Sequence, residues 1–261
     1  MDSEPYVLTI RDLPDSNVRK ILDGFLNLIY PERCFLCSIP VSRHHEYGVC
    51  GSCWAKAVAL KIVPPRCVSC GLPLRNFREN SDHLCGDCIR QMPPYSGARS
   101  FGHYHAELRL LVQGLKFQNR RNLVKLLAPL LARAFHDSWR KEDFDLIVPV
   151  PLHHKRKLER GYNQSGLLAR SLARRIGIRC SRALIRTRST LPQVGLTDSQ
   201  RMENVRRAFH CTNPGQISGR CILLIDDVMT TGATAASASG TLLAGGARRV
   251  SVLTVARTEK R

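Results

Sequence analysis

The sequence CILLIDDVMTTGATA at residues 221–235 joins an apolar run, two adjacent acids, and a short series of hydroxyl and small residues. The apolar run at 221–225 lies in an expected strand at 221–226 and is typical of a parallel sheet, because helices cover both faces of such a sheet. A helix is expected from about Thr234 to Ala244, ended by Gly245 and Gly246. This succession of strand, loop and helix predicts an α/β fold.

The flanking sequence repeats the same alternation. Strands are expected at 98–104, 146–150, 182–187 and 250–256, and helices near 106–117, 121–139 and 162–175. The pattern predicts that residues 97–261 form one α/β domain, with a mainly parallel sheet flanked by helices.

The loop between the acids and the helix has the composition of an anion site. Backbone N–H groups at a helix N-terminus favour a phosphate, and hydroxyl side chains add further donors. The expected ligands are Thr230, Thr231, Gly232, Ala233 and Thr234. The loop is not a Walker A motif, because the GxxxxGK[ST] pattern is missing.

Asp226 and Asp227 lie at the carboxyl end of the expected strand, at the edge where open α/β sheets bind ligands. Two carboxylates beside a phosphate alone would repel it. A ribose removes the conflict, because its hydroxyls donate to the acids while its 5′-phosphate occupies the loop. The pair is therefore the candidate catalytic and ribose-binding group.

Eight of the eleven cysteines form four Cys-x2-Cys pairs within residues 31–93. Two such pairs complete a four-thiolate zinc site with no position open for water, so two structural zinc ions are expected. Sequential pairing closes shorter loops than an interleaved cross-brace. Disulfides and redox-active pairs are the alternatives to metal. The expected ligands are Cys34, Cys37, Cys50, Cys53, Cys67, Cys70, Cys85 and Cys88.

The composition adds constraints on partners and location. The 261 residues include 40 Lys and Arg against 21 Asp and Glu, a formal charge of +19 that favours a polyanionic partner. Aromatic residues make up 6%, which is few for a protein that stacks single-stranded bases. An amphipathic helix is expected at 17–30, packed on the rest of the protein. With no membrane span and no signal peptide expected, we predict a cytoplasmic protein.

Three segments resemble known families. Residues 222–234 resemble the phosphoribosyl pyrophosphate (PRPP) motif of type I phosphoribosyltransferases, and residues 148–164 and 191–209 resemble signature stretches of ComF-type proteins. That family carries an N-terminal zinc ribbon ahead of a phosphoribosyltransferase fold, the order expected here. His154 departs from it, since proline is common at that position. Gln193, Arg201 and Asn204 stand at family motif positions.

The resemblance implies PRPP with Mg²⁺ as cofactor. Lys155, Arg156 and Arg160, expected in a loop after the 146–150 strand, would meet the pyrophosphate, although a solvated basic loop is the alternative. Only five residues follow the last expected strand, so no C-terminal hood is expected over the sugar, and the zinc module would take its place.

The resemblance also implies a protein that handles single-stranded DNA in natural transformation. Its partners would include a competence helicase or other DNA-processing proteins. Two alternatives stay open: an active phosphoribosyltransferase of nucleotide or salvage metabolism, and a non-catalytic regulator that senses PRPP. DNA handling and turnover are compatible.

Overall fold

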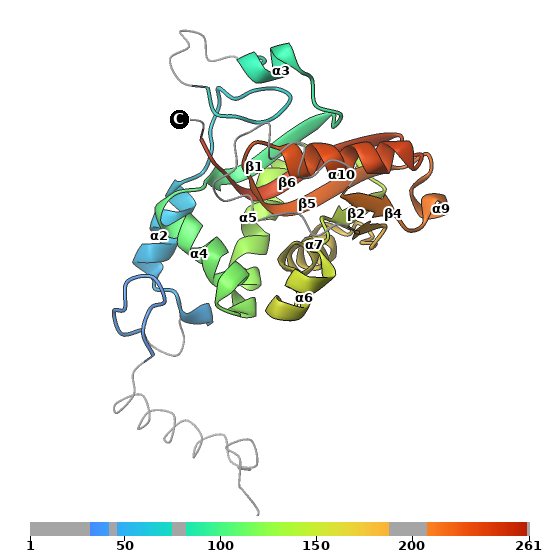
Figure 1. Cartoon of the computed structure of the whole chain (residues 1–261). Coiled ribbons are helices and arrows are strands. Elements are labelled where there is room, and N and C mark those ends of the chain that lie inside the picture. Colours follow the sequence, from blue (N-terminus) through green and yellow to red (C-terminus); the bar gives the residue numbers. More distant parts are fainter. Residues whose placement is uncertain (1–31, 42–45, 75–81, 188–207, 260–261) are drawn as a thin grey trace, which may run out of the picture. The chain divides into compact units, whose positions relative to one another are not determined.

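The computed structural model describes residues 32–41, 46–74, 82–187 and 208–259 (Figure 1). The chain forms two compact units, the first ending at Trp54 and the second running from Ala55 to Arg261. The expected helix at 17–30 and the motif residues Gln193, Arg201 and Asn204 lie outside the described residues.

The first unit contains a zinc knuckle. The backbone N–H of Cys34 donates to the carbonyl of Ile39 at 2.8 Å, and the N–H of Ser38 donates to the carbonyl of Cys34 at 2.8 Å. These bonds turn the chain back on itself between the bridged residues Arg33 and Pro40. Of the second cysteine pair of this unit, Cys50 lies between the 3-10 helix η2 (Glu46–Gly48) and α2 (Gly51–Ala59), and Cys53 lies in the first turn of α2.

A four-stranded parallel sheet organises the second unit. Its strand order is β1-β6-β5-β2, and all three pairings are parallel, as expected of a mainly parallel sheet. The side chains of Ile222–Ile225 are fully buried in β5, and burial of each such side chain is worth about 1.5–3 kcal/mol. The strands are β1 (Gly97–His103), β2 (Leu146–Pro149), β5 (Cys221–Met229) and β6 (Arg249–Arg257).

Helices flank this sheet. Helices α5 and α7 pack against each other and against the sheet, and α10 packs on β5 and β6 (Figure 1). The sheet flanked by helices is confirmed. The longer helices are α4 (Ala106–Phe117), α5 (Val124–His136), α7 (Gln164–Ile176) and α10 (Ala233–Ala244).

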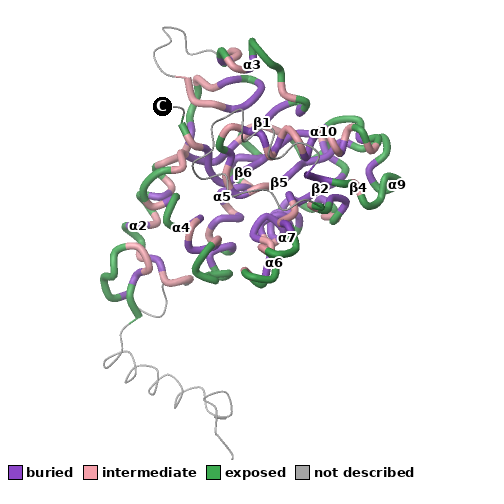
Figure 2. The backbone as a smooth tube through the Cα atoms, in the orientation of Figure 1, coloured by how far each residue is buried: buried purple, intermediate pink, exposed green. Residues whose placement is uncertain are grey.

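The remaining elements are short and lie around the sheet. Figure 2 shows the central strands buried and the outer sides of α6 and α9 exposed. β3 pairs with β4 in an antiparallel ribbon. The bounds are α3 (Gly86–Arg90), η3 (Arg121–Leu123), η4 (Lys141–Asp143), α6 (His154–Arg160), β3 (Leu184–Arg186), β4 (Phe209–Cys211) and α9 (Pro214–Ile217). Among the described residues, no helix is long and apolar enough to cross a membrane.

The second group of four cysteines, Cys67, Cys70, Cys85 and Cys88, belongs to the unit that contains the sheet. The backbone N–H of Ala98 in β1 donates to the carbonyl of Ser69 at 2.7 Å. Gly71 follows with φ +70°, and a Cβ atom at this position would lie 2.3 Å from the Ala98 carbonyl oxygen. The close approach of backbone to backbone therefore requires glycine at 71.

Gly71→Ala is expected to lower the free energy of unfolding by about 2 kcal/mol or more, because it combines a left-handed backbone with a clash against the sheet. Gly240→Ala is the matched control. It lies within α10 and has open space around its Cβ position, so it should stabilise by about 0.5–1 kcal/mol. Denaturant unfolding of both variants checks the prediction, and a Gly71→Ala variant as stable as wild type would contradict the packing described.

Candidate functional site

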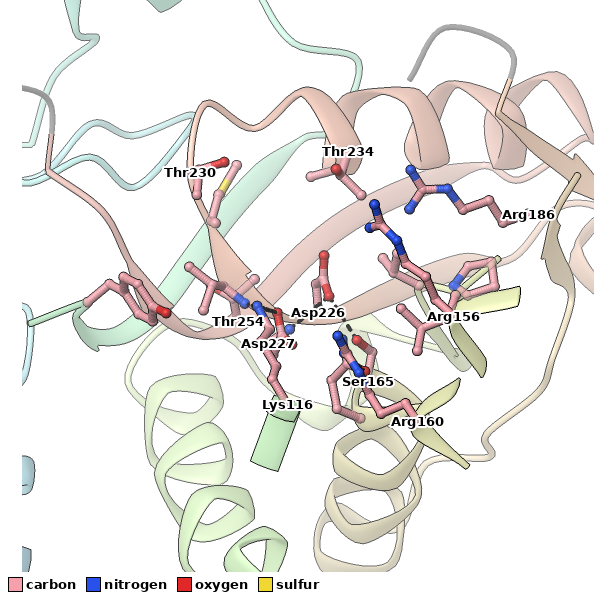
Figure 3. Close-up of a pocket in the computed structure, with 18 of the residues that line it drawn as sticks. Lys116, Arg156, Arg160, Ser165, Arg186, Asp226, Asp227, Thr230, Thr234 and Thr254 are labelled. Atoms are coloured by element: carbon pink, nitrogen blue, oxygen red, sulfur yellow. Dashed lines mark hydrogen bonds and ion pairs between the residues drawn. The ribbon is translucent and has the colours of Figure 1, made fainter. Parts of the chain in front are cut away.

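A pocket of about 610 Å³ opens at the carboxyl ends of β2 and β5. Its floor comes from the end of β5, and its walls come from α4, α6, α7, β3 and the loop that leads into α10 (Figure 3). Polar and charged side chains from segments far apart in the sequence meet here. They are Tyr104, Lys116, Arg156, Glu159, Arg160, Gln164, Ser165, Arg186, Asp226, Asp227, Thr230, Thr234 and Thr254.

Asp227 is buried beside a lysine. Its side chain is 4% exposed, and its Oδ1 lies 2.8 Å from the Nζ of Lys116 at the end of α4. The same oxygen accepts a hydrogen bond from the N–H of Val228 at 2.7 Å. Its other oxygen, Oδ2, has no hydrogen-bond partner among the described residues. This buried carboxylate therefore keeps one acceptor atom unsatisfied.

Asp226 is held by neutral donors. Its Oδ1 accepts from the hydroxyl of Ser165 at 2.8 Å and from the N–H of Asp227 at 2.9 Å. Figure 3 shows the carboxyl group between Ser165, Arg156 and Thr234. Ser165 lies in the first turn of α7, where the preceding Asn163 caps the helix by accepting from the Ser165 N–H. The start of α7 is therefore placed against the end of β5.

The two acids differ in their electrostatic environment. Burial raises the pKa of Asp226 to about 7, and the charge of Asp227 adds to the effect, while Lys116 and Ser165 oppose it. Burial acts to lower the pKa of Lys116, but Asp227 and Asp226 outweigh it and the net shift is upward. Lys116 therefore stays charged and pairs with Asp227, and Asp226 is the carboxyl group that gains most from a ligand that donates hydrogen bonds.

The loop after β5 forms the upper wall. Gly232 adopts φ 85° at the N-terminal end of α10, and a Cβ atom there would lie 3.0 Å from Met229 Cε and 3.3 Å from the Tyr95 hydroxyl. Of the five predicted loop residues, Thr230, Gly232 and Thr234 line the pocket. Thr231 instead accepts from the Ala233 N–H at 3.4 Å through its hydroxyl. Thr231 and Ala233 therefore do not line the pocket.

The basic segment after β2 is a helix rather than the expected loop. Gly161 ends α6 in the left-handed conformation. Arg156 and Arg160, four residues apart, share one face and line the pocket. Lys155 is exposed and is not among the lining residues. The structure thus brings two of the three predicted basic residues to the acids.

Arg186 in β3 is a third arginine of the pocket, and the sequence did not single it out. Burial lowers its pKa, the charge of Arg156 acts in the same direction, and Asp226 opposes them. Figure 3 shows its side chain reaching the same wall as Arg156. Lys116, Ser165 and Arg186 were missed because each lies outside a recognisable motif and reaches the site only through the packing of its helix or strand.

The eight paired cysteines form two groups, paired sequentially. Within each group all four sulfur atoms lie within 4.8 Å of one another. The sulfur–sulfur distances of 3.6 Å for Cys37 and Cys50 and 3.7 Å for Cys70 and Cys85 are too long for disulfides. They suit a tetrahedral zinc site, in which Zn–S bonds of about 2.3 Å place the sulfurs about 3.8 Å apart. Both groups fit structural zinc.

Backbone donors favour the thiolate form that zinc requires at one cysteine of each group, whereas burial raises the pKa of Cys53, Cys70 and Cys88. Although burial acts to raise it, hydrogen bonds from the N–H groups of Cys50, Cys37 and Leu36 lower the pKa of Cys34 to about 6. The corresponding bonds to Cys67 lower its pKa to about 7. The Cys50 and Cys85 amides lie 3.3 Å from Cys34 and Cys67 Sγ, respectively. The two groups therefore repeat one geometry.

The second group is tied to the end of β6. Arg257 is buried, and its Nη1 donates to the Cys70 carbonyl at 2.8 Å while its Nη2 lies 3.5 Å from the Cys70 sulfur. The cysteines of this group and Tyr95 belong to the same buried cluster as β5 and α10. This knuckle is consequently part of the core on which the pocket is built.

Comparison with known proteins gives one family profile, described as "Double zinc ribbon domain", over residues 25–89. The "DNA utilization protein YhgH" of Escherichia coli O157:H7 is 35% identical, over 88% of this chain and 99% of that protein. "Competence protein F" of Haemophilus influenzae is 32% identical, over 86% of this chain and 96% of that protein. "Competence protein ComFC" of Bacillus subtilis is 30% identical, over 80% of this chain and 84% of that protein.

Among solved structures, the glutamine PRPP amidotransferase of B. subtilis complexed with ADP and GMP aligns with a TM-score of 0.37 at 21% identity. The alignment covers 52% of this chain and 26% of that enzyme.

The zinc assignment predicts two zinc ions per chain. Replacing two ligands of the first site, in Cys50→Ser with Cys53→Ser, should lower the content to one ion, because the second site lies in the other compact unit. Elemental analysis of the purified proteins measures both values. A wild-type content of one, or loss of both ions in the variant, would show that the cysteines do not form two independent sites.

Asp226→Asn is expected to stabilise the ligand-free protein. Asparagine keeps the oxygen that accepts from Ser165 but carries no charge, so the unfolding midpoint at pH 8 should rise by about 2–4 °C, the effect of 1 kcal/mol in a domain of this size. Because the folded pKa of about 7 exceeds the ordinary value of 3.8, ionisation costs stability as the pH rises through this window. The rise in unfolding midpoint caused by Asp226→Asn should therefore increase between pH 5.5 and pH 7.

Thermal melts at pH 5.5, 6.5 and 8 test this sign. Glu142→Gln, which removes an exposed carboxylate in η4 far from the pocket lining, is the control and should change the midpoint little. An Asp226→Asn gain that is independent of pH, or a loss of stability at pH 8, would contradict the raised pKa.

Proposed function

Because the chain belongs to the ComF family of competence and DNA utilization proteins, we propose that it binds PRPP with Mg²⁺ and handles single-stranded DNA during natural transformation. The observation that carries the proposal is the convergence of two acids, a phosphate loop and three arginines on one pocket. We also propose a cytoplasmic location, with a double zinc ribbon at 31–93 and a phosphoribosyltransferase-like domain at 97–261.

The acids are suited to a ribose. Lys116 neutralises Asp227 within the pocket, so the site is not a bare pair of negative charges. Asp227 Oδ2 and the carboxyl group of Asp226 can each accept a hydrogen bond, and the 2′- and 3′-hydroxyls of a ribose supply two adjacent donors. A phosphate placed on the acids would instead be repelled.

The two ends of the pocket are suited to phosphates. The N-terminus of the 12-residue helix α10, with the Thr230 and Thr234 hydroxyls beside it, provides donors for a 5′-phosphate. Arg156 and Arg160 of α6, and Arg186 beside them, provide charge for a pyrophosphate. A volume of about 610 Å³ lies within the range of about 300–1,000 Å³ usual for small-ligand sites.

Mg²⁺ fits this arrangement as a partner of the ligand. Carboxylates and substrate phosphates are its usual oxygen ligands in such sites. When bound with PRPP, it would neutralise the pyrophosphate, which Asp226 and Asp227 would otherwise repel. The role of the protein side chains is to hold the sugar and the phosphate groups in place.

DNA handling rests on charge as well as on family membership. The formal charge of +19 favours a polyanion. Exposed Lys155 and Lys157 extend the basic face of α6 beyond the pocket. We propose a competence helicase or another DNA-processing protein as the functional partner, because such proteins act on the same single strand.

Phosphoribosyl transfer is the second candidate function. It is favoured by the position of Asp226 and Asp227 on the pocket floor, where they would stabilise positive charge that develops on the sugar. Release of pyrophosphate from PRPP in the presence of a nucleobase or DNA would identify an enzyme. Binding of PRPP without release would instead identify a sensor.

The variant carrying both Asp226→Asn and Asp227→Asn is expected to bind Mg²⁺·PRPP at least about 100-fold more weakly than wild type, because two hydrogen bonds to charged groups are lost. Calorimetric titration of zinc-loaded protein measures the affinity. Glu142→Gln is again the control and should bind as wild type does. Retained affinity in a double variant with native circular dichroism and zinc content would refute the ribose contacts.

A further inference from the structure

One aromatic side chain at the rim of the pocket is unused by the proposed ribose and phosphate contacts. Phe117, the last residue of α4, lines the pocket and is 70% exposed. Among the residues that the structure describes, it is the one exposed Phe, Tyr or Trp. Because this exposed ring lines the pocket, its face is available for contact with a ligand bound there.

The position of Phe117 is fixed by its neighbours. The preceding residue, Lys116, points into the pocket toward Asp227 at 2.8 Å. The hydroxyl of Tyr162 donates to the carbonyl of Leu115 and so ties the last turn of α4 to the segment between α6 and α7. The ring is therefore presented from a rigid helix end and not from a mobile loop.

A guanidinium group lies over this ring. The Cζ of Arg160 is 5.1 Å from the ring centroid of Phe117. A hydrogen bond of 2.9 Å from Arg160 Nη1 to Gln164 Oε1 holds the side chain in place. Planar guanidinium groups and aromatic rings are the two side-chain surfaces on which unstacked bases pack. The two flat groups here lie together at the mouth of a pocket suited to ribose.

The charges around the ring favour a phosphate-bearing ligand. Arg121 lies 4.7 Å from the ring centroid of Tyr162, and its guanidinium would come within 3.1 Å of a Cβ at Gly161, the residue after Arg160. Arg120 and Arg121 are exposed just beyond the end of α4. Glu159 is the one acid besides Asp226 and Asp227 among the residues that line the pocket.

We propose that Phe117 and Arg160 form a stacking subsite for a nucleobase at the mouth of this pocket. The inference rests on the proposed function, because a base stacked here shares a pocket of about 610 Å³ with the ribose expected at Asp226 and Asp227. The ligand class is a flat nucleobase, whether free or part of a single DNA strand. The subsite gives this aromatic-poor protein a local means of holding bases.

The first test measures binding of a labelled oligothymidine by fluorescence anisotropy at fixed salt. Phe117→Ala should weaken binding by about 10-fold, the usual scale for loss of one stacked base, and Phe117→Trp should retain wild-type affinity. Leu158→Ala is the matched control, because this apolar side chain on α6 is 80% exposed but is not among the lining residues. It should bind as wild type does.

An abasic strand of the same length separates stacking from charge. It offers phosphates without bases, so wild type and Phe117→Ala should bind it equally. Bases should also quench the fluorescence of the indole introduced by Phe117→Trp. The subsite would be overturned if Phe117→Ala bound both oligothymidine and free bases within twofold of wild type, or if it lost equal affinity for the abasic strand.

Calorimetry with free adenine, guanine and uracil distinguishes the two sources of the base. Loss of free-base binding in Phe117→Ala identifies an acceptor subsite, and loss confined to the oligonucleotide identifies a DNA contact. Absence of both kinds of binding in wild type would overturn the proposal. PRPP affinity, measured in the same variants, should stay within twofold of wild type. A wild-type protein that stacks bases but does not bind PRPP would refute the proposed function and leave the subsite standing.

Discussion

Two adjacent carboxylates in the carboxyl-terminal half of β5 are the constraint around which the second unit is arranged. Asp226 and Asp227 follow Ile222–Ile225, so neither can move to bulk water without disrupting β5. Each acid is stabilised by one side chain from a helix. Lys116 Nζ lies 2.8 Å from Asp227 Oδ1, and the Ser165 hydroxyl donates to Asp226 Oδ1 at 2.8 Å. For both contacts to form, α4 must end and α7 must begin at this edge of the sheet.

These contacts offset only part of the cost of burying two negative charges, and the uncompensated part favours a ligand that donates hydrogen bonds. Lys116 balances one negative charge, while burial and the neighbouring acid raise the pKa of Asp226 to about 7. A ligand that donates hydrogen bonds relieves this cost, so binding and stability oppose each other at Asp226. A structural ion pair alone would not require the second acid or the unpartnered Oδ2 of Asp227.

The local features of this site were readable from the sequence, because each rests on contiguous residues. The apolar run of β5, the small-residue loop and the paired cysteines needed only spacing and composition, and the parallel sheet and the double zinc ribbon are confirmed. Lys116, Ser165 and Arg186 were not readable, because tertiary packing brings them to the acids. The segment expected as a basic loop is α6, a helix of good helix formers ended by Gly161.

The division of the two zinc groups between the compact units was equally hidden from the sequence. Four similar cysteine pairs suggested one module, yet Arg257 joins the second group to β6, and Tyr95 joins the same buried cluster. A Cβ at Gly232 would meet the Tyr95 hydroxyl at 3.3 Å. Tyr95 thus links the second cysteine group with the loop proposed to hold the 5′-phosphate, and zinc bound to this group would support the site as well as the fold.

A crystal structure of the zinc-loaded protein with PRPP and Mg²⁺ tests the central claim most directly. The account predicts the ribose 2′- and 3′-hydroxyls within about 2.6–3.0 Å of carboxylate oxygens of Asp226 and Asp227, with the 5′-phosphate on the loop that precedes α10. Electron density that places a phosphate against the two acids, or the ligand outside the pocket, would contradict it.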